Sequence, residues 1–148
     1  MMIDISFVHS IHCKDESEKG LEENMNKEMI RPQITAYECM LLIFSELVKK
    51  GKTLLRQDTL VSTLYEYREN EATEILFEDI AFRKNLDTIT SVDVEDSLSR
   101  LQTFGAIGRL NPAYEKIVIY ISREEADNFL NSFAEQYKDA ADIVSEAF

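Results

Sequence analysis

The chain has 148 residues, of which 45% are hydrophobic and 30% are charged. This length lets one domain bury a core without disulfide bonds or metal, and the composition is that of a soluble globular protein. The longest uninterrupted apolar run, Cys39 to Phe44, is far shorter than the roughly 20 residues of a membrane-spanning helix. We therefore expect no membrane span, and the lack of a basic leader in residues 1–12 predicts a cytoplasmic protein.

Acidic side chains outnumber basic ones by 28 to 16, which gives a formal net charge of -12. Such a charge disfavours a non-specific grip on phosphates. One cationic cluster stands out in an otherwise neutral stretch: Lys49, Lys50, Lys52 and Arg56. These residues either complement the C-terminal end of a helix dipole or form a binding patch.

Residues 1–33 are predicted to be an N-terminal arm or linker ahead of the folded domain. The only two histidines, His9 and His12, stand beside Cys13 within five residues of chain. Zinc would need a fourth ligand, and no second cysteine or histidine pair is present to close its coordination shell. We therefore expect no metal or other cofactor, and a metal-dependent sensor or enzyme built on these three residues stays open as a third class.

The folded domain is predicted to begin at about Ile34. Thr35 and Glu38 have the spacing of a capping box, which starts a helix. Apolar residues then recur at helical spacing, and Gly51 supplies a left-handed stop. Residues 53–55 are expected to form a short strand.

Two further helices are predicted before residue 90. Apolar positions return to helical spacing from about Asp58, and the acidic stretch 69–74 is expected to contain a break. A third helix is predicted from about Thr73 to Asn85, with Leu76 and Ile80 facing inward.

The stretch from Ser91 to Gly105 predicts a helix with a Thr90 or Ser91 cap and a glycine stop. Its buried residues are expected to be Val94, Leu98 and Leu101. The turn 111–114 then separates two apolar segments, 106–110 and 117–121, which predicts a β-hairpin.

This order of elements, with Leu98, Leu101, Gly105 and Ile107 at the junction of helix and hairpin, resembles the winged-helix family over about residues 35–121. The resemblance implies a mainly α domain, residues 34–121, with a small β-hairpin wing. The roughly 20 residues between the helix near Asp58 and the helix near Ser91 exceed a short turn and imply an extra helix.

In winged-helix regulators the helix corresponding to residues 91–104 commonly lies in the DNA major groove. Here the exposed N-terminal part of that helix carries Asp93, Glu95 and Asp96, which would face phosphates. Carboxylates at this position are otherwise explained by capping and by the helix dipole. The resemblance therefore implies a protein-binding subunit in preference to a DNA reader.

Ser122 and Glu125 form a second capping box, and apolar residues at helical spacing continue to the end of the chain. The pattern predicts one amphipathic helix of about 25 residues over 122–148. Its apolar stripe either packs on the domain itself or forms a dimer or partner interface. The candidate interface residues are Phe129, Phe133, Tyr137, Val144 and Phe148.

The sequence holds no P-loop, no dinucleotide-binding glycine motif and no nucleophile elbow, so we do not expect an enzyme. The interpretation is a non-enzymatic, acidic interaction subunit that self-associates or binds a protein partner. The alternative is a winged-helix transcriptional regulator that binds DNA. Its candidate contacts are Lys49, Lys50, Lys52, Arg56, Arg109 and Lys116.

Overall fold

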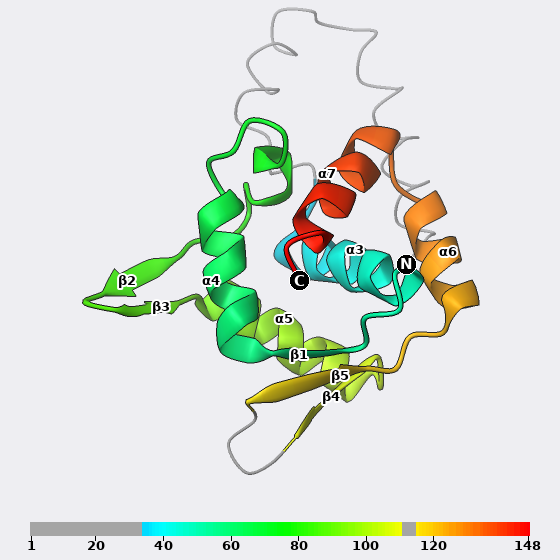
Figure 1. The fold of residues 1–148 in the computed structure, drawn as a ribbon, viewed down its shortest axis with the longest axis horizontal. Helices are drawn as coiled ribbons and strands as arrows, with labels where there is room; N and C mark the ends of the chain where they lie inside the picture. Colours follow the sequence, from blue (N-terminus) through cyan, green and yellow to red (C-terminus); the bar gives the residue numbers. More distant parts are fainter. Residues whose placement is uncertain (1–33, 111–114) are drawn as a thin grey trace, which may run out of the picture. The chain divides into compact units, whose positions relative to one another are not determined.

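The helix α3 (Ala36–Lys49) is the element on which the helices α5, α6 and α7 pack (Figure 1). The computed structural model describes residues 34–110 and 115–148. The predicted capping box is present, because the Glu38 N–H donates to Thr35 Oγ1 at 3.1 Å and the Thr35 N–H donates to Glu38 Oε1 at 2.9 Å. The helix ends where expected, and Gly51 adopts a left-handed φ of 78°.

Three short strands form an antiparallel sheet of order β1–β5–β4. They are β1 (Leu54–Arg56), β4 (Ile107–Leu110) and β5 (Lys116–Ile119). The short strand and the hairpin predicted from the sequence are both confirmed. The register pairs Leu54 with Val118 and Ile107 with Ile119, so β5 lies between the other two strands.

The helices α4 (Gln57–Tyr67) and α5 (Val92–Thr103) follow the predicted pattern. Ser91 caps α5, because its hydroxyl accepts a hydrogen bond from the Val94 N–H at 3.2 Å. The residues Val94, Leu98 and Leu101 are buried as expected. Gly105 ends the helix with a φ of 81°.

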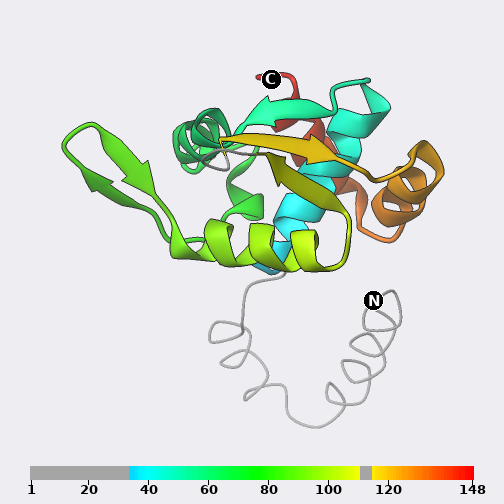
Figure 2. The ribbon, with the colours of Figure 1, turned by 90° about the horizontal axis from the view of Figure 1, so that it is seen from below.

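The third helix predicted over 73–85 is wrong. The chain makes one turn of 3-10 helix, η1 (Glu74–Leu76), and then extends into a hairpin of β2 (Arg83–Asn85) and β3 (Thr88–Thr90). Leu76 and Ile80 are buried as predicted, but two inward residues four positions apart are compatible with an irregular chain as well as with a helix. The hairpin projects away from the helices in both views (Figures 1 and 2).

The single C-terminal helix of about 25 residues is also wrong. The structure has two helices, α6 (Arg123–Asn131) and α7 (Glu135–Ser145). The Ser132 hydroxyl donates to the Phe129 carbonyl at 2.7 Å, and Ala134 is extended with a ψ of 155°. This break lets both helices pack on α3, which one straight helix of that length could not do.

The described residues therefore combine five α-helices with two small antiparallel sheets. The expected combination of helices with a β-hairpin is present, while the second sheet makes the fold more mixed than the sequence predicts. None of these helices is long and apolar enough to cross a membrane.

Candidate functional site

Arg109 on β4 connects the β4–β5 hairpin to one face of α5. Its guanidinium donates to Glu95 Oε2 at 2.7 Å, to Gln102 Oε1 at 3.0 Å and to Ser99 Oγ at 3.1 Å. The Arg109 side chain is only 6% exposed. Hydrogen bonds to an ionised group are the stronger kind, so this network holds α5 and the hairpin in one arrangement.

Gln57 extends the same network to α4. Its amide nitrogen donates to Glu95 Oε1 at 3.1 Å, while its amide oxygen lies 3.4 Å from Nη1 of Arg109. The first turn of α4, the first turn of α5 and the strand β4 are thereby joined through polar side chains.

Two further polar side chains of α5 make contacts with other elements. Asp93 accepts a hydrogen bond from the backbone N–H of Ala81 at 2.8 Å, which attaches the chain leading into the β2–β3 hairpin. The Arg100 guanidinium lies 4.4 Å from the centre of the Tyr37 ring, a cation–π contact. Burial raises the pKa of Tyr37, although Arg100 opposes the shift.

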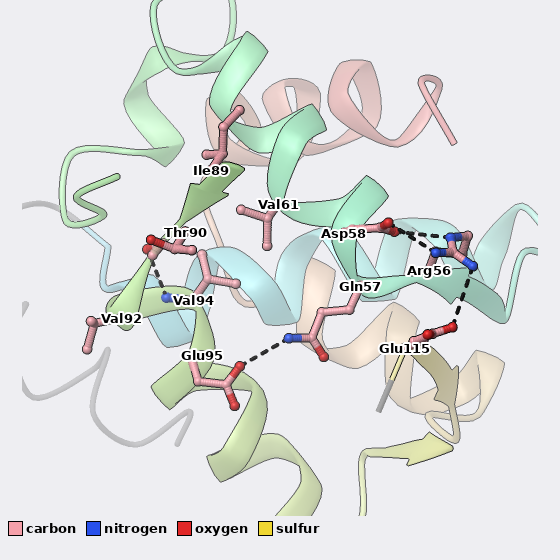
Figure 3. A pocket seen from close by; sticks show the side chains of 11 residues that line it. Arg56, Gln57, Asp58, Val61, Ile89, Thr90, Val92, Val94, Glu95 and Glu115 are labelled. Carbon is pink, nitrogen blue, oxygen red and sulfur yellow. Dashed lines mark hydrogen bonds and ion pairs between the residues drawn. The ribbon is translucent and has the colours of Figure 1, made fainter. Parts of the chain in front are cut away.

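A groove of about 540 Å³ opens between α4 and the N-terminal end of α5 (Figure 3). This volume is in the range of ligand-binding pockets. The apolar side chains Val61, Ile89 and Val94 gather in one part of it, next to the start of α5. Charged and amide side chains surround the rest: Arg56, Gln57, Asp58, Glu95 and Glu115.

The charged part of the groove has an excess of carboxylates. Arg56 makes two 3.1 Å hydrogen bonds to Asp58 and lies 3.9 Å from Glu115. The hydrogen bond from Arg56 lowers the pKa of Asp58, which keeps this carboxylate ionised. Three carboxylates line the groove (Asp58, Glu95, Glu115) against one lining guanidinium, and Arg109 pairs with Glu95 from behind, so one negative charge remains in excess.

The cationic cluster predicted from the sequence is not a free patch. Lys49 lies 3.5 Å from Asp127, and Lys50 contacts Asp142 and, at 3.2 Å, Glu146. Burial lowers the pKa of Lys50, but the hydrogen bonds and the negative charges of Asp142 and Glu146 together raise this pKa above its ordinary value.

Lys52 Nζ donates to the Phe148 carbonyl at 3.0 Å. Arg56 and Arg109 are held as described above, and Lys116 is exposed at the start of β5. Lys49, Lys50 and Lys52 therefore attach the end of α3 and the turn after it to α6, to α7 and to the last residue of the chain.

The candidate interface residues of the C-terminal segment pack within the chain. Tyr137 and Val144 are buried in the core, and Phe129, Phe133 and Phe148 are half-buried against it. The break at 132–134 folds the segment back onto α3 and buries Tyr137 and Val144, while an interface role for the three half-buried residues stays a prediction.

The candidate metal ligands His9, His12 and Cys13 lie outside the described residues. Within 34–110 and 115–148, no group of three or more histidine, cysteine, aspartate or glutamate side chains is arranged to hold a metal ion. Cys39 is a free, fully buried cysteine, and burial raises the pKa of its thiol. It is the small buried hydrophobe that its apolar surroundings predict.

Comparison of the chain with protein-family models, with curated proteins and with solved structures finds no match. The groove was not anticipated from the sequence, because its walls come from three separate segments. One available signal was the β-branched run Thr88-Ile89-Thr90, which favours a strand directly after the segment that was predicted to be helical.

Proposed function

We propose that this chain is a non-enzymatic protein-interaction domain of the winged-helix type. The chain order α3–β1–α4–α5–β4–β5 and the sheet order β1–β5–β4 support that assignment. In it, α5 takes the place of the recognition helix and β4–β5 forms the wing. The β2–β3 hairpin is an insertion between α4 and α5.

The Arg109 network is the observation that carries the proposal. A helix that reads DNA needs side chains free to reach base edges and a surface that tolerates phosphates. Here Glu95, Ser99 and Gln102 of α5 are hydrogen-bonded to Arg109. Asp96 is exposed on the same helix and would repel the phosphate backbone.

A transcriptional regulator that binds DNA is the second candidate. Arg83 and Lys84 favour it, because both are exposed on the projecting β2–β3 hairpin. Most of the other candidate cations support it less, because Lys49, Lys50, Arg56 and Arg109 are paired with carboxylates of the same chain.

Duplex binding by the full chain separates the two candidates. We expect mobility-shift titrations at physiological salt to show no binding tighter than roughly 10⁻⁴ M, the weak limit of non-specific affinity. Selection from a genomic fragment library should enrich no sequence. A sub-micromolar, salt-sensitive shift that is lost in Arg83→Ala/Lys84→Ala would overturn the proposal in favour of the regulator.

The interaction itself is tested by isolating a complex and measuring its mass. The full chain should form a stoichiometric complex with a protein partner, or with a second copy of itself, in sedimentation experiments on purified components. A chain that sediments as a monomer at high micromolar concentration restricts the proposal to a different protein as partner.

A further inference from the structure

We propose that the groove between α4 and α5 binds a short peptide segment of a partner protein in which a basic side chain stands next to an aliphatic one. This inference rests on the interaction function proposed above and names the site and the chemistry of the partner. Its size suits one or two side chains rather than a folded domain, since it encloses about 540 Å³.

The apolar part of the groove calls for an aliphatic side chain. Val61 and Ile89 are half-buried there, and Val92 is 74% exposed. Val92 is the first residue of α5, a position at which a polar or acidic side chain would serve the helix as well or better. An aliphatic side chain placed against Val61 and Ile89 would remove their exposed surface from water, and Val92 adds apolar surface at the rim of the same groove.

The charged part calls for a cation. The side chains of Asp58, Glu95 and Glu115 remain 69%, 49% and 55% exposed although each already contacts an arginine. Their oxygens therefore keep free positions for further hydrogen bonds, and an arginine or lysine of a ligand can supply the donors.

An anionic ligand is disfavoured at the same place. The N-terminal ends of α4 and α5 both line the groove, and helix N-termini ordinarily attract anions. Here the chain supplies its own groups: Asp58 accepts from the Thr59 N–H at 2.8 Å, and Ser91 accepts from the Val94 N–H at 3.2 Å. A phosphate or carboxylate ligand would be repelled by the carboxylates that line the groove.

The two walls of the groove are fixed relative to each other before a ligand binds. The Gln57–Glu95 hydrogen bond joins its two walls, and Arg109 holds Glu95 from behind. A site whose walls are already ordered loses little conformational entropy when a ligand enters.

The test is a titration of the isotope-labelled full chain with three blocked hexapeptides, followed by two-dimensional amide NMR. The first peptide alternates arginine with leucine, the second alternates glutamate with leucine, and the third alternates arginine with serine. The arginine–leucine peptide should shift the amides of Val61, Ile89, Val92 and Glu95 saturably and more weakly at high salt. The other two should bind at least roughly tenfold more weakly, because one lacks the basic side chain and the other lacks the aliphatic side chain.

Val92→Lys is the critical variant, because it removes apolar surface and adds a repulsive charge at an exposed position where folding is not at risk. It should weaken binding of the arginine–leucine peptide by roughly tenfold or more. The matched control is Ile143→Lys, an exposed apolar residue on α7 that does not line the groove, and it should bind as the wild type does. Equal binding by both variants, equal binding of the glutamate–leucine peptide, or no shift of the groove amides would overturn the inference.

Two outcomes separate this inference from the proposed function. A protein complex that Val92→Lys leaves intact would exclude the groove as the docking site while the interaction function stands. Tight DNA binding would remove the interaction function whatever the peptides do. If the same amides shift on dilution of the chain alone, a second copy occupies the groove, and the assignment to a peptide segment is overturned.

Discussion

The Glu95 carboxylate lies 2.7 Å from the Arg109 guanidinium, and this ion pair joins α5 to the β4–β5 hairpin. The two partners differ in environment, since the arginine side chain is almost fully buried and the glutamate side chain is half exposed. Arg109 binds one oxygen of the Glu95 carboxylate, and the other oxygen lies in the groove, where it accepts a hydrogen bond from Gln57. The stability of the chain and the charge of the groove therefore depend on the same two residues.

Replacing Arg109 by Met should lower the free energy of unfolding by about 2 to 3 kcal/mol, because Glu95 and its neighbours lose a charged hydrogen-bonding partner. Urea denaturation of the full chain measures this. Arg100→Met is the matched control and should cost less than about 1 kcal/mol, since the contact of Arg100 with Tyr37 is an exposed cation–π contact. A double-mutant cycle with Glu95→Gln should give a coupling of about 1 kcal/mol or more. Additive effects would contradict the pairing.

Lys50 should stabilise the chain in a pH-dependent way. Its pKa is raised above the ordinary value of 10.5, so the protonated form is favoured by folding. The stabilisation is fully present below about pH 10.5 and is lost as the pH rises through the folded-state pKa.

The measurement for Lys50 is the difference in unfolding free energy between wild type and Lys50→Met across the alkaline range. The difference should stay constant at neutral pH and shrink at strongly alkaline pH. Lys116→Met, an exposed lysine on β5, should change stability little at neutral pH. A Lys50 difference that grows with pH would refute the assignment.

Two glycines should respond differently to alanine. Gly105 has a left-handed φ of 81° and open space around it, so Gly105→Ala should cost about 1 kcal/mol through the backbone alone. At Gly108 an added Cβ would lie 2.8 Å from the far end of the Tyr120 ring. Since that ring is exposed and able to rotate away, Gly108→Ala should cost less and should shift the Tyr120 resonances. The prediction fails if Tyr120→Ala rescues Gly105→Ala as well as Gly108→Ala.

Tyr137 should contribute to the core and not to self-association. It is buried on α7, so Tyr137→Ala should lower the free energy of unfolding by about 3 kcal/mol. The sedimentation mass should stay that of the wild type. Ile143→Ala, on the same helix but 39% exposed, should cost less than about 1 kcal/mol. A change of mass with unchanged stability would return the C-terminal stripe to an interface role.

Cys39 should be inert to thiol reagents in the folded chain. It is fully buried, and burial raises the pKa of its thiol, so the reactive thiolate is scarce even at mildly alkaline pH. A Cys13→Ser variant leaves Cys39 as the single cysteine. This variant should react with an aromatic disulfide reagent only at the rate of unfolding, and at once in denaturant. Rapid labelling of the native variant would contradict the burial.

Local sequence signals determined where α3 and α5 begin and end and where α6 begins. The capping pairs Thr35 with Glu38 and Ser122 with Glu125 form in the structure as predicted, and Gly105 ends α5. Such signals are readable because the interacting groups stand within four residues of each other and need no partner elsewhere.

Only the tertiary structure determined the conformation of segments whose apolar spacing is compatible with more than one secondary structure. Residues 73–85 leave the predicted helix because Phe82 packs on Tyr65 with ring centres 5.7 Å apart and Ala81 donates to Asp93. The C-terminal stripe breaks into two helices because both must pack on α3. The groove and its carboxylate excess depend on Gln57, Glu95 and Glu115, which come from separate elements. Their proximity depends on the packing of the whole chain, because no pattern within one segment specifies a contact between residues this far apart in sequence.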